Sequence, residues 1–202
     1  MKTLLIIDVQ NDFMPGGALP VPKGDRVVPV INRLQKKFEL VVATQDWHPK
    51  GHASFASSHV RNKEFDVIKI NGLDQVLWPD HCVQGSAGAN FHPQLETVRI
   101  ESIFRKGTNL EIDSYSGFYD NAHLKSTGLN GYLKEKGVNE LYVAGLAGEF
   151  CVYFSVLDAL AEGFSVTVIE DATKPLDQEA FEVAKIDILR KGGQIITSHN
   201  LR

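Results

Sequence analysis

Branched apolar runs alternate with segments of helical periodicity along most of the chain. Residues 3–9 read TLLIIDV, which is typical of a strand buried on both faces of a sheet. A polar loop then leads to Val27, Ile31, Leu34 and Phe38, which recur at helical spacing. Further strands are predicted at residues 40–44, 98–104, 141–144, 165–169 and 194–197, and further helices within residues 121–136 and at residues 151–162 and 178–191. This alternation predicts an α/β fold, a three-layer αβα sandwich with a mainly parallel central sheet.

The alternation of strands and helices loosens in the middle of the chain. Residues 46–93 are rich in His, Pro, Gly, Ser and Asn, with brief apolar pieces such as residues 67–70. Long loop-rich segments inside a compact domain commonly carry function. No linker or low-complexity segment marks a domain boundary. We therefore expect one domain, residues 1–202, with a loop-rich, metal-binding insertion around residues 46–93.

Length, composition and charge narrow the classes of protein further. The chain has 202 residues, of which 43% are hydrophobic and 23% charged, and these values suit one globular domain. Its formal net charge of -4 gives no basic surface for nucleic acid. The longest apolar runs are far shorter than the roughly 18 to 20 residues that span a bilayer, so we expect no membrane partner and no signal peptide. Two cysteines in different contexts favour a reduced, cytoplasmic compartment.

Polar residues follow several of the predicted strands. Asp8 and Asp46 come at the ends of the first two strands, Lys106 follows the third, and Cys151 follows the fourth after a short turn. Ligands of open parallel sheets bind at the carboxyl ends of the strands, so these side chains are candidates for a shared site. Taken alone, an aspartate such as Asp8 is more often a helix cap or a ligand of loop N–H groups, and a lysine such as Lys106 is more often a solvated charge.

Cys151 differs from an ordinary core cysteine in its position. It lies after the small-residue turn of residues 145–148, near the start of a predicted helix. Unpaired backbone N–H groups and the helix dipole at such a position lower the pKa of a thiol, and the same N–H groups can hold an oxyanion. The sequence therefore indicates a nucleophilic cysteine, with a buried structural cysteine as the alternative.

A second group of polar residues lies in the loop-rich segment. Asp46 and His48 are two residues apart after a predicted strand, His52 follows, and His81 lies in the segment WPDHCV. One aspartate and two histidines form a 2-His-1-carboxylate candidate, whose open positions suit a catalytic or substrate-anchoring metal. Such donors suit zinc, iron or manganese. Solvated loop residues are the alternative interpretation.

Aromatic residues are interleaved with these polar groups. Phe13 follows Asp8 by a few residues, Trp47 lies between Asp46 and His48, and Trp78 precedes His81. Aromatic side chains most often pack in the core. Their positions beside candidate catalytic and metal-binding groups also suit a flat ring substrate.

Several spaced motifs together make the chain resemble the nicotinamidases, within the isochorismatase-like cysteine hydrolases. In chain order they are IIDVQNDF with the following GGAL, ATQDWHP, HASF, LWPDHCV, FRKGT, DSYSGFYDN and AGLAGEFCV. Motifs that cover nearly the whole chain in the order of the family are far more specific than any single one. The resemblance implies the isochorismatase-like hydrolase fold.

The resemblance also implies roles for the positions that match. The catalytic triad of the family falls on Asp8, Lys106 and Cys151. Its metal ligands fall on Asp46, His48 and His81, with His52 as a second-rank ligand. The residues that sandwich a pyridine ring fall on Phe13 and Trp78, and a cis peptide that shapes the oxyanion hole falls on Leu146 and Ala147.

The chain departs from the pattern of the family in two places. Many members have Thr-Asp before the Tyr-Cys pair, and this chain has Gly148, Glu149 and Phe150 there. Many members also carry an Arg-Gly-Val segment after the sixth strand, where this chain has TKPL at residues 173–176. Ala147 and Cys151 keep their places.

The activity implied by the resemblance is hydrolysis of nicotinamide to nicotinate and ammonia, through a cysteine thioester, in NAD salvage. The implied cofactor is one divalent metal ion, zinc in the first place, with iron or manganese as alternatives. The implied partner is a small molecule, nicotinamide, with pyrazinamide as an analogue, and a homo-oligomer is compatible with the resemblance.

Two other functions compete with this interpretation. Another amide or carbamoyl hydrolase of the same superfamily would share Asp8, Lys106 and Cys151 but would have little use for Asp46, His48 and His81 together. A metal-binding or thiol-sensing protein without turnover would not need the complete set of Asp8, Lys106 and Cys151.

Overall fold

The computed structural model describes residues 1–201, and a six-stranded sheet forms its centre. The strands lie in the order β5-β2-β1-β6-β7-β8, and every neighbouring pair is parallel. Their bounds are β1 (Lys2–Ile7), β2 (Leu40–Asp46), β5 (Ser102–Lys106), β6 (Glu140–Leu146), β7 (Ser165–Lys174) and β8 (Gln194–Ile196). The mainly parallel α/β sheet predicted from the sequence is confirmed.

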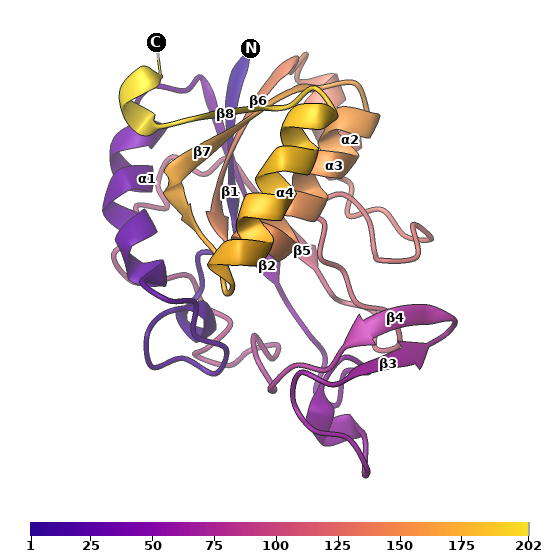
Figure 1. The fold of residues 1–202 in the computed structure, drawn as a ribbon. Coiled ribbons are helices and arrows are strands. Elements are labelled where there is room, and N and C mark those ends of the chain that lie inside the picture. The colour runs from indigo at the N-terminus through magenta and orange to yellow at the C-terminus, as the bar shows by residue number, and fades with distance from the viewer. Residues whose placement is uncertain (202) are drawn as a thin grey trace.

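Helices cover both faces of this sheet. They are α1 (Val27–Gln35), α2 (Leu129–Glu135), α3 (Tyr153–Ala161) and α4 (Gln178–Arg190). In Figure 1, α1 lies on one side of the sheet and the other three helices lie on the opposite side. The predicted three-layer αβα sandwich is therefore confirmed. Short turns are η1 (Asn11–Phe13), η2 (Gly24–Arg26), η3 (Ala56–Ser58), η5 (Ser198–Asn200) and a π turn, η4 (Gly148–Val152).

The central strand β1 shows why the sequence forms this sandwich. Successive side chains of a strand point to opposite faces, so Leu4 and Ile6 join the core that α1 covers, whereas Leu5 and Ile7 join the core beneath α2 and α3. All seven residues of β2 are buried. Continuous apolar runs are therefore required here, because both faces of a parallel sheet are covered.

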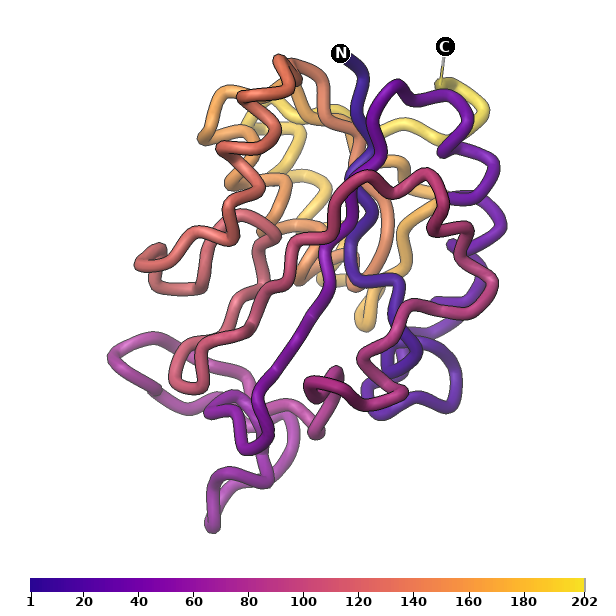
Figure 2. Tube along the Cα trace, turned by 180° about the vertical axis from the view of Figure 1, so that it is seen from behind, coloured from indigo at the N-terminus to yellow at the C-terminus, as the bar shows by residue number. Residues whose placement is uncertain are grey.

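The connections of the sheet create a switch point beside β1. The chain continues from β1 to β2 and β5 on one side, then crosses to β6, β7 and β8 on the other. In open α/β sheets, ligands bind at the carboxyl ends of the strands near such a point. Figures 1 and 2 show both chain termini at the end of the molecule opposite the hairpin of β3 (Val67–Ile70) and β4 (Leu73–Val76).

The segment between β2 and β5 is largely loop, as the composition predicts. It contains η3 and the antiparallel hairpin β3-β4. Isolated bridges pair His48 with Val83 and Phe55 with Trp78 within the segment. Distant parts of this segment are thereby fixed to each other beyond the carboxyl ends of β2.

Several predicted bounds need correction. The strand predicted at residues 98–104 begins at Ser102, and Val98 before it is 98% exposed. Val98 belongs to the loop because its apolar side chain finds no core at the edge of the sheet. The helix predicted to begin at Cys151 is divided, since Cys151 lies in η4 and α3 begins at Tyr153.

None of the helices within residues 1–201 combines the length and the apolar character needed to cross a bilayer.

Candidate active site and metal centre

Four neighbouring strands bring the predicted catalytic residues together. Asp8 directly follows β1, Lys106 ends β5, and Asp46 ends β2, paired in register with Lys106. Cys151 enters from η4, which follows β6 on the other side of β1. Residues separated by more than a hundred positions in sequence therefore meet at one edge of the sheet.

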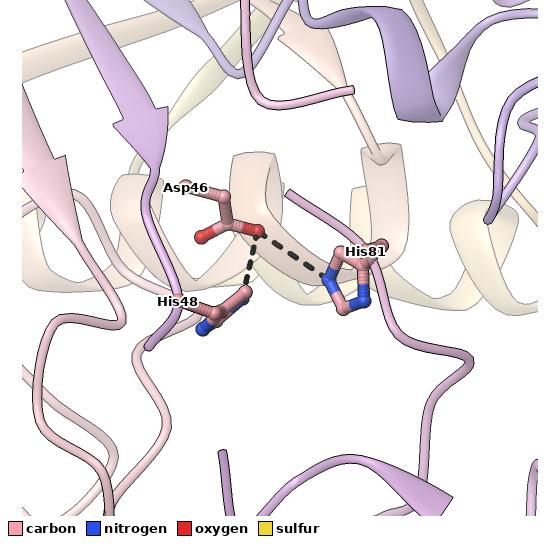
Figure 3. Close-up of side chains that lie close together, drawn as sticks. All are labelled: Asp46, His48 and His81. Atoms are coloured by element: carbon pink, nitrogen blue, oxygen red, sulfur yellow. Dashed lines mark ion pairs between the residues drawn. The ribbon is translucent and has the colours of Figure 1, made fainter. Parts of the chain in front are cut away.

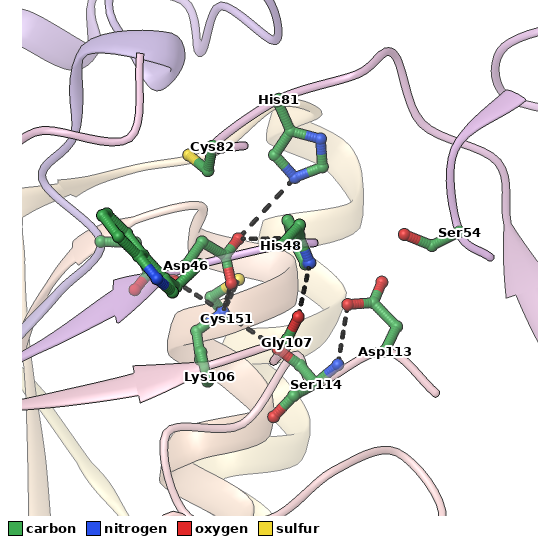
Figure 4. A network of polar contacts seen from close by, with 12 residues as sticks. Asp46, His48, Ser54, His81, Cys82, Lys106, Gly107, Asp113, Ser114 and Cys151 are labelled. Atoms are coloured by element: carbon green, nitrogen blue, oxygen red, sulfur yellow. Dashed lines mark hydrogen bonds and ion pairs between the residues drawn. The ribbon is translucent and has the colours of Figure 1, made fainter. Parts of the chain in front are cut away.

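Lys106 lies at the centre of this group and is 2% exposed. Its Nζ is 2.6 Å from Asp46 Oδ1 and 3.3 Å from Cys151 Sγ (Figure 4). The same Nζ is 2.9 Å from Asp8 Oδ2. The Nζ also donates to the carbonyl oxygen of Ser114 at 3.0 Å. Burial alone would lower the pKa of Lys106, but the two carboxylates outweigh it and hold the pKa well above its usual value. Lys106 is therefore a permanent positive charge beside the thiol.

Asp8 is fully buried beside this ammonium. Its Oδ1 accepts a hydrogen bond of 2.6 Å from Thr44 Oγ1. Burial raises the pKa of the Asp8 carboxyl above its usual value, and the attraction of Lys106 offsets part of that rise. A carboxylate oxygen of Asp8 and Cys151 Sγ lie within 4.8 Å of each other. Asp8 can therefore exchange a proton with a group bound beside the thiol.

The Cys151 thiol is buried, with 7% of the residue exposed. Burial raises its pKa well above the usual value of a thiol, while the charge of Lys106 acts in the opposite direction. The sequence predicts a lowered pKa for Cys151, because it lies near the start of a helix. The pKa is raised instead, because the side chain is more deeply buried than its position in the sequence implies. The resting thiol is thus protonated, and a reaction at sulfur requires a base.

Asp46, His48 and His81 form the second group (Figure 3). Asp46 Oδ2 is 3.5 Å from His48 Nε2 and 3.7 Å from His81 Nε2, so three donor atoms face one small space. Burial alone would raise the pKa of Asp46, but Lys106 and His48 hold it well below its usual value. All three residues are at most 4% exposed. These donors suit a divalent metal ion.

The second nitrogen of each imidazole ring is held by the backbone. His48 Nδ1 lies 3.1 Å from the carbonyl oxygen of Gly107, and His81 Nδ1 lies 2.8 Å from that of Pro79. Such contacts fix the tautomer of a ligand and leave Nε2 free for a metal. Gly107 is required here, since its φ is +64° and a Cβ would lie 2.3 Å from the His48 ring.

The loop of His48 is also fixed to the loop of His81. His48 N donates to the carbonyl oxygen of Cys82 at 3.0 Å, and Gln84 N donates to that of His48 at 2.9 Å. Gln10 holds the preceding strand end, because its side chain contacts both the N–H and the carbonyl oxygen of Asp46 at 2.8 Å. Asp46, His48 and His81, called the metal group below, are therefore preorganised by backbone contacts between distant segments.

His52 stands beside this group, not within it. Its ring centroid is 4.6 Å from that of His48, and its Nδ1 is 2.8 Å from Ser54 Oγ. Together with His48 and Asp113, it forms a separate set of possible ligands. Burial lowers the pKa of His52 to about 4, so its ring is neutral at neutral pH, as metal binding requires.

A pocket joins the two groups. Cys151, Ala147 and the three metal-group residues line it, together with Phe13 and Trp78. Its remaining walls include Leu19, Asp113, Tyr115, Phe150 and Leu176. The Leu146–Ala147 peptide bond at the edge of this pocket is cis. A flat molecule in the pocket would thus contact aromatic side chains, metal ligands and the thiol at once.

Sequence reasoning assigned no role to several residues of this site. Tyr115 packs against Trp78 with ring centroids 6.3 Å apart, and Asp113 accepts from Gln75 Nε2 at 3.2 Å. Both lie in the motif DSYSGFYDN, which marked the family but carried no recognisable chemistry. Gln10 lies in IIDVQNDF, and its bridging of two strand ends becomes visible only once β1 and β2 are adjacent.

Two comparisons of sequence agree on the relatives of this chain. A family model, the Isochorismatase domain, matches residues 2–200. A nicotinamidase of Escherichia coli is 48% identical over 86% of this chain and 83% of its own length. A nicotinamidase of Acinetobacter baylyi is 45% identical over 98% of this chain and 93% of its own length.

Solved structures agree with this result. A nicotinamidase/pyrazinamidase of Acinetobacter baumanii has a TM-score of 0.97 at 46% identity, covering 100% of this chain and 98% of its own. PnC1 of L. infantum, in complex with nicotinate, has a TM-score of 0.88 at 38% identity, with coverage of 100% and 95%. A pyrazinamidase of Pyrococcus horikoshii in complex with zinc has a TM-score of 0.80 at 37% identity, with coverage of 97% and 98%. The chain belongs to the isochorismatase family.

Proposed function

We propose that the protein hydrolyses nicotinamide to nicotinate and ammonia, with Cys151 as nucleophile, as a step of NAD salvage. The observation that carries this proposal is the position of Lys106 Nζ, in contact with Asp8, Asp46 and Cys151. Asp46 and Cys151 also line the aromatic pocket. Relatives of 45% and 48% identity that are nicotinamidases support the choice of substrate.

The first half of the reaction forms a thioester. Asp8 accepts the proton of the Cys151 thiol, and Lys106 stabilises the resulting thiolate. The sulfur attacks the carboxamide carbon, and backbone N–H groups of Ala147 and Cys151 stabilise the oxyanion. The proton held by Asp8 passes to the nitrogen as the carbon–nitrogen bond breaks, so ammonia leaves and an acyl group remains on Cys151.

The second half returns the enzyme to its starting state. Asp8 now accepts a proton from water, and the oxygen of that water attacks the thioester carbon. The carbon–sulfur bond breaks, and the proton on Asp8 returns to the sulfur. The product leaves as the acid, which loses the second proton of the water to solvent and becomes nicotinate. A carboxyl whose pKa is raised by burial suits this double role, because it can both accept and release a proton.

The second group orients the substrate. A divalent metal ion held by Asp46, His48 and His81 would supply a Lewis acid for the ring nitrogen, and we propose zinc because the donors suit it and a relative binds it. Phe13 and Trp78 bracket the ring between them in this proposal. Asp46 also contacts Lys106 at 2.6 Å, so ring position and thiol position depend on one carboxylate.

Ammonia release tests the proposed function directly. The purified protein, loaded with zinc, should release equal amounts of ammonia and nicotinate from nicotinamide, and also ammonia from pyrazinamide. Cys151→Ala, which retains the metal group, is the matched control and should release neither product. Intact nicotinamide after incubation with folded, zinc-loaded protein would contradict the proposal.

A second candidate is hydrolysis of another amide or carbamoyl compound. Asp8, Lys106 and Cys151 would serve that chemistry equally well, so the metal group carries the distinction. Buried donors held in place by Gly107 and Pro79 carbonyls favour a substrate that needs a metal contact. Faster turnover of an amide without a ring nitrogen would favour the second candidate.

A further inference from the structure

The turn that carries the nucleophile is tied to the loop after β7. Glu149 lies two residues before Cys151 and is 8% exposed. Its Oε1 accepts from Asp177 N at 2.6 Å, and its Oε2 accepts from Leu176 N at 3.2 Å. One buried carboxylate therefore binds two consecutive N–H groups of a segment 27 and 28 residues away.

Gly148, the residue before Glu149 in the turn, packs against α4, which follows the loop that Glu149 binds. A Cβ at Gly148 would lie 2.8 Å from the ring of Phe181 on α4, so the ring packs where a larger side chain would stand. Asp177 caps α4, since its side chain accepts from Glu179 N and Ala180 N at 2.8 and 3.0 Å. Both places where the chain departs from the family pattern thus lie against each other.

The loop that Glu149 holds forms part of the catalytic pocket. The side chain of Leu176 lines that pocket, and so does Phe150, which lies between Glu149 and Cys151. Leu19 and Phe13 line the same pocket. A displacement of Leu176 would therefore change the space available to a ring beside the thiol.

We propose that Glu149 is a positioning residue that holds Leu176 against the ring pocket and thereby sets which substituted pyridine carboxamides the pocket accepts. This inference rests on the proposed function. Glu149 acts through Leu176, because its own carboxylate is occupied by backbone N–H groups of the loop.

The chemistry of the contact calls for a carboxylate. Both oxygens accept from N–H groups, and a carboxylate has no hydrogen atom to turn toward a donor. The glutamine side chain has the same shape, but its amide nitrogen would face one of these N–H groups and lose that bond. Glu149→Gln should therefore loosen the Leu176 loop while leaving Asp8, Lys106 and Cys151 in place.

Substrate selectivity separates this role from a general structural one. One methyl group in an apolar pocket changes kcat/KM by roughly 10- to 200-fold. We therefore compare nicotinamide with nicotinamides methylated at each free ring carbon. For at least one of these compounds, Leu176→Ala should raise kcat/KM relative to nicotinamide by about tenfold. Glu149→Gln should raise the same ratio by about threefold, and the double variant should match Leu176→Ala.

Hydrogen exchange supplies a readout that does not depend on activity. The amides of Leu176 and Asp177 should exchange faster in Glu149→Gln than in the wild type. Glu182→Gln on the exposed face of α4 is the matched control and should leave both exchange and selectivity unchanged. Glu149→Asp, one methylene shorter, provides the same measurements if Glu149→Gln does not fold.

The outcomes are separable from those of the proposed function. Wild-type protein that leaves nicotinamide intact contradicts the proposed function, whatever the exchange rates are. With an active wild type, selectivity ratios unchanged in Glu149→Gln would overturn the inference. Effects of Glu149→Gln and Leu176→Ala that multiply in the double variant would also overturn it, because Glu149 would then not act through Leu176.

Discussion

The loop of Cys82 and the turn of Cys151 place two free thiols in very different surroundings. Both cysteines are buried, and burial raises the pKa of both. The strongest charge effect on Cys151 comes from the Lys106 ammonium at 3.3 Å, which lowers the pKa of the thiol. The strongest charge effects on Cys82 come from the carboxylates of Asp46, Asp12 and Asp8, which raise its pKa further. Burial alone therefore does not favour a thiolate, whereas a positive charge in contact with the sulfur does.

The backbone supports the same distinction. Cys82 has a φ of 46°, and its N–H donates to Asp12 Oδ2 at 2.7 Å, which fixes the loop beside His81. Cys82 thus serves the metal group through its backbone: its carbonyl oxygen accepts from His48 N. Cys151 directs its sulfur into the pocket lined by Phe13 and Trp78.

The largest difference between the two regions should appear on removal of each sulfur. Cys151→Ala should lower kcat for nicotinamide by several orders of magnitude, since loss of a nucleophile removes the covalent route. Cys82→Ala should keep most of the activity, because the hydrogen bonds of Cys82 are made by its backbone and alanine preserves them. Ammonia release measures both, and bound metal and thermal unfolding show that each variant is intact. Similar losses in the two variants would remove the distinction.

The next largest effect concerns the charges around Cys151. Lys106→Met and Asp8→Asn should each lower kcat by about a hundredfold or more, because proton transfer at sulfur contributes factors of that size. Their effects on alkylation should differ. Lys106 lowers the pKa of the thiol and Asp8 raises it, so iodoacetamide should react with Cys151 more slowly in Lys106→Met but not in Asp8→Asn.

Cys82 is the internal control for that experiment. Peptide mass spectrometry distinguishes alkylation of Cys82 from that of Cys151, and Cys82 should stay unmodified in every folded variant. Equal alkylation rates of Cys151 in the wild type and Lys106→Met would show that the ammonium does not activate the thiol.

Removal of the metal should separate ring binding from thiol chemistry. Chelation or His48→Ala should impair hydrolysis of pyridine carboxamides by about a hundredfold, since small errors in orientation cost that much. Alkylation of Cys151 should survive. Benzamide, which lacks the ring nitrogen, should be a poor substrate with or without metal. Full activity after chelation, together with equal rates for benzamide and nicotinamide, would contradict the role of Asp46, His48 and His81.

The smallest effect is a displaced pH profile. Asp8 must be ionised to accept the thiol proton, and burial raises its pKa. Activity should therefore be lost as the pH falls through this raised pKa, at a higher pH than an ordinary aspartate would give. The pH dependence of kcat/KM for nicotinamide measures this limb. A profile that stays flat down to the ordinary pKa of aspartate would show that Asp8 is not the base.

Much of the site could be predicted because it follows from strand ends. The apolar runs that become β1, β2 and β6, and the strand pattern that ends at β5, are visible in the sequence, and parallel strands bring their carboxyl ends to one edge. Asp8, Asp46 and Lys106 are thereby brought together by topology. Cys151 needed one further signal, the small-residue turn before it.

Features that depend on contacts between distant loops could not be predicted. The side chain of Gln10 joins two strand ends, and Glu149 binds a loop that follows β7. The partners of these two residues cannot be predicted from their spacing in the sequence. The predicted beginning of β5 was wrong for a related reason. Val98 is an apolar, β-branched residue typical of a strand, but it lies exposed before the edge strand β5.

Trapping of the acyl group with hydroxylamine tests the thioester on Cys151 most directly. Nicotinamide and methyl nicotinate have different leaving groups but would give the same acyl-Cys151. We predict that both substrates, in the presence of hydroxylamine, yield nicotinohydroxamate and nicotinate in the same ratio, and that Cys151→Ala yields neither product. Ratios that differ between the two substrates, or nicotinate formed by Cys151→Ala, would contradict a shared thioester at this residue.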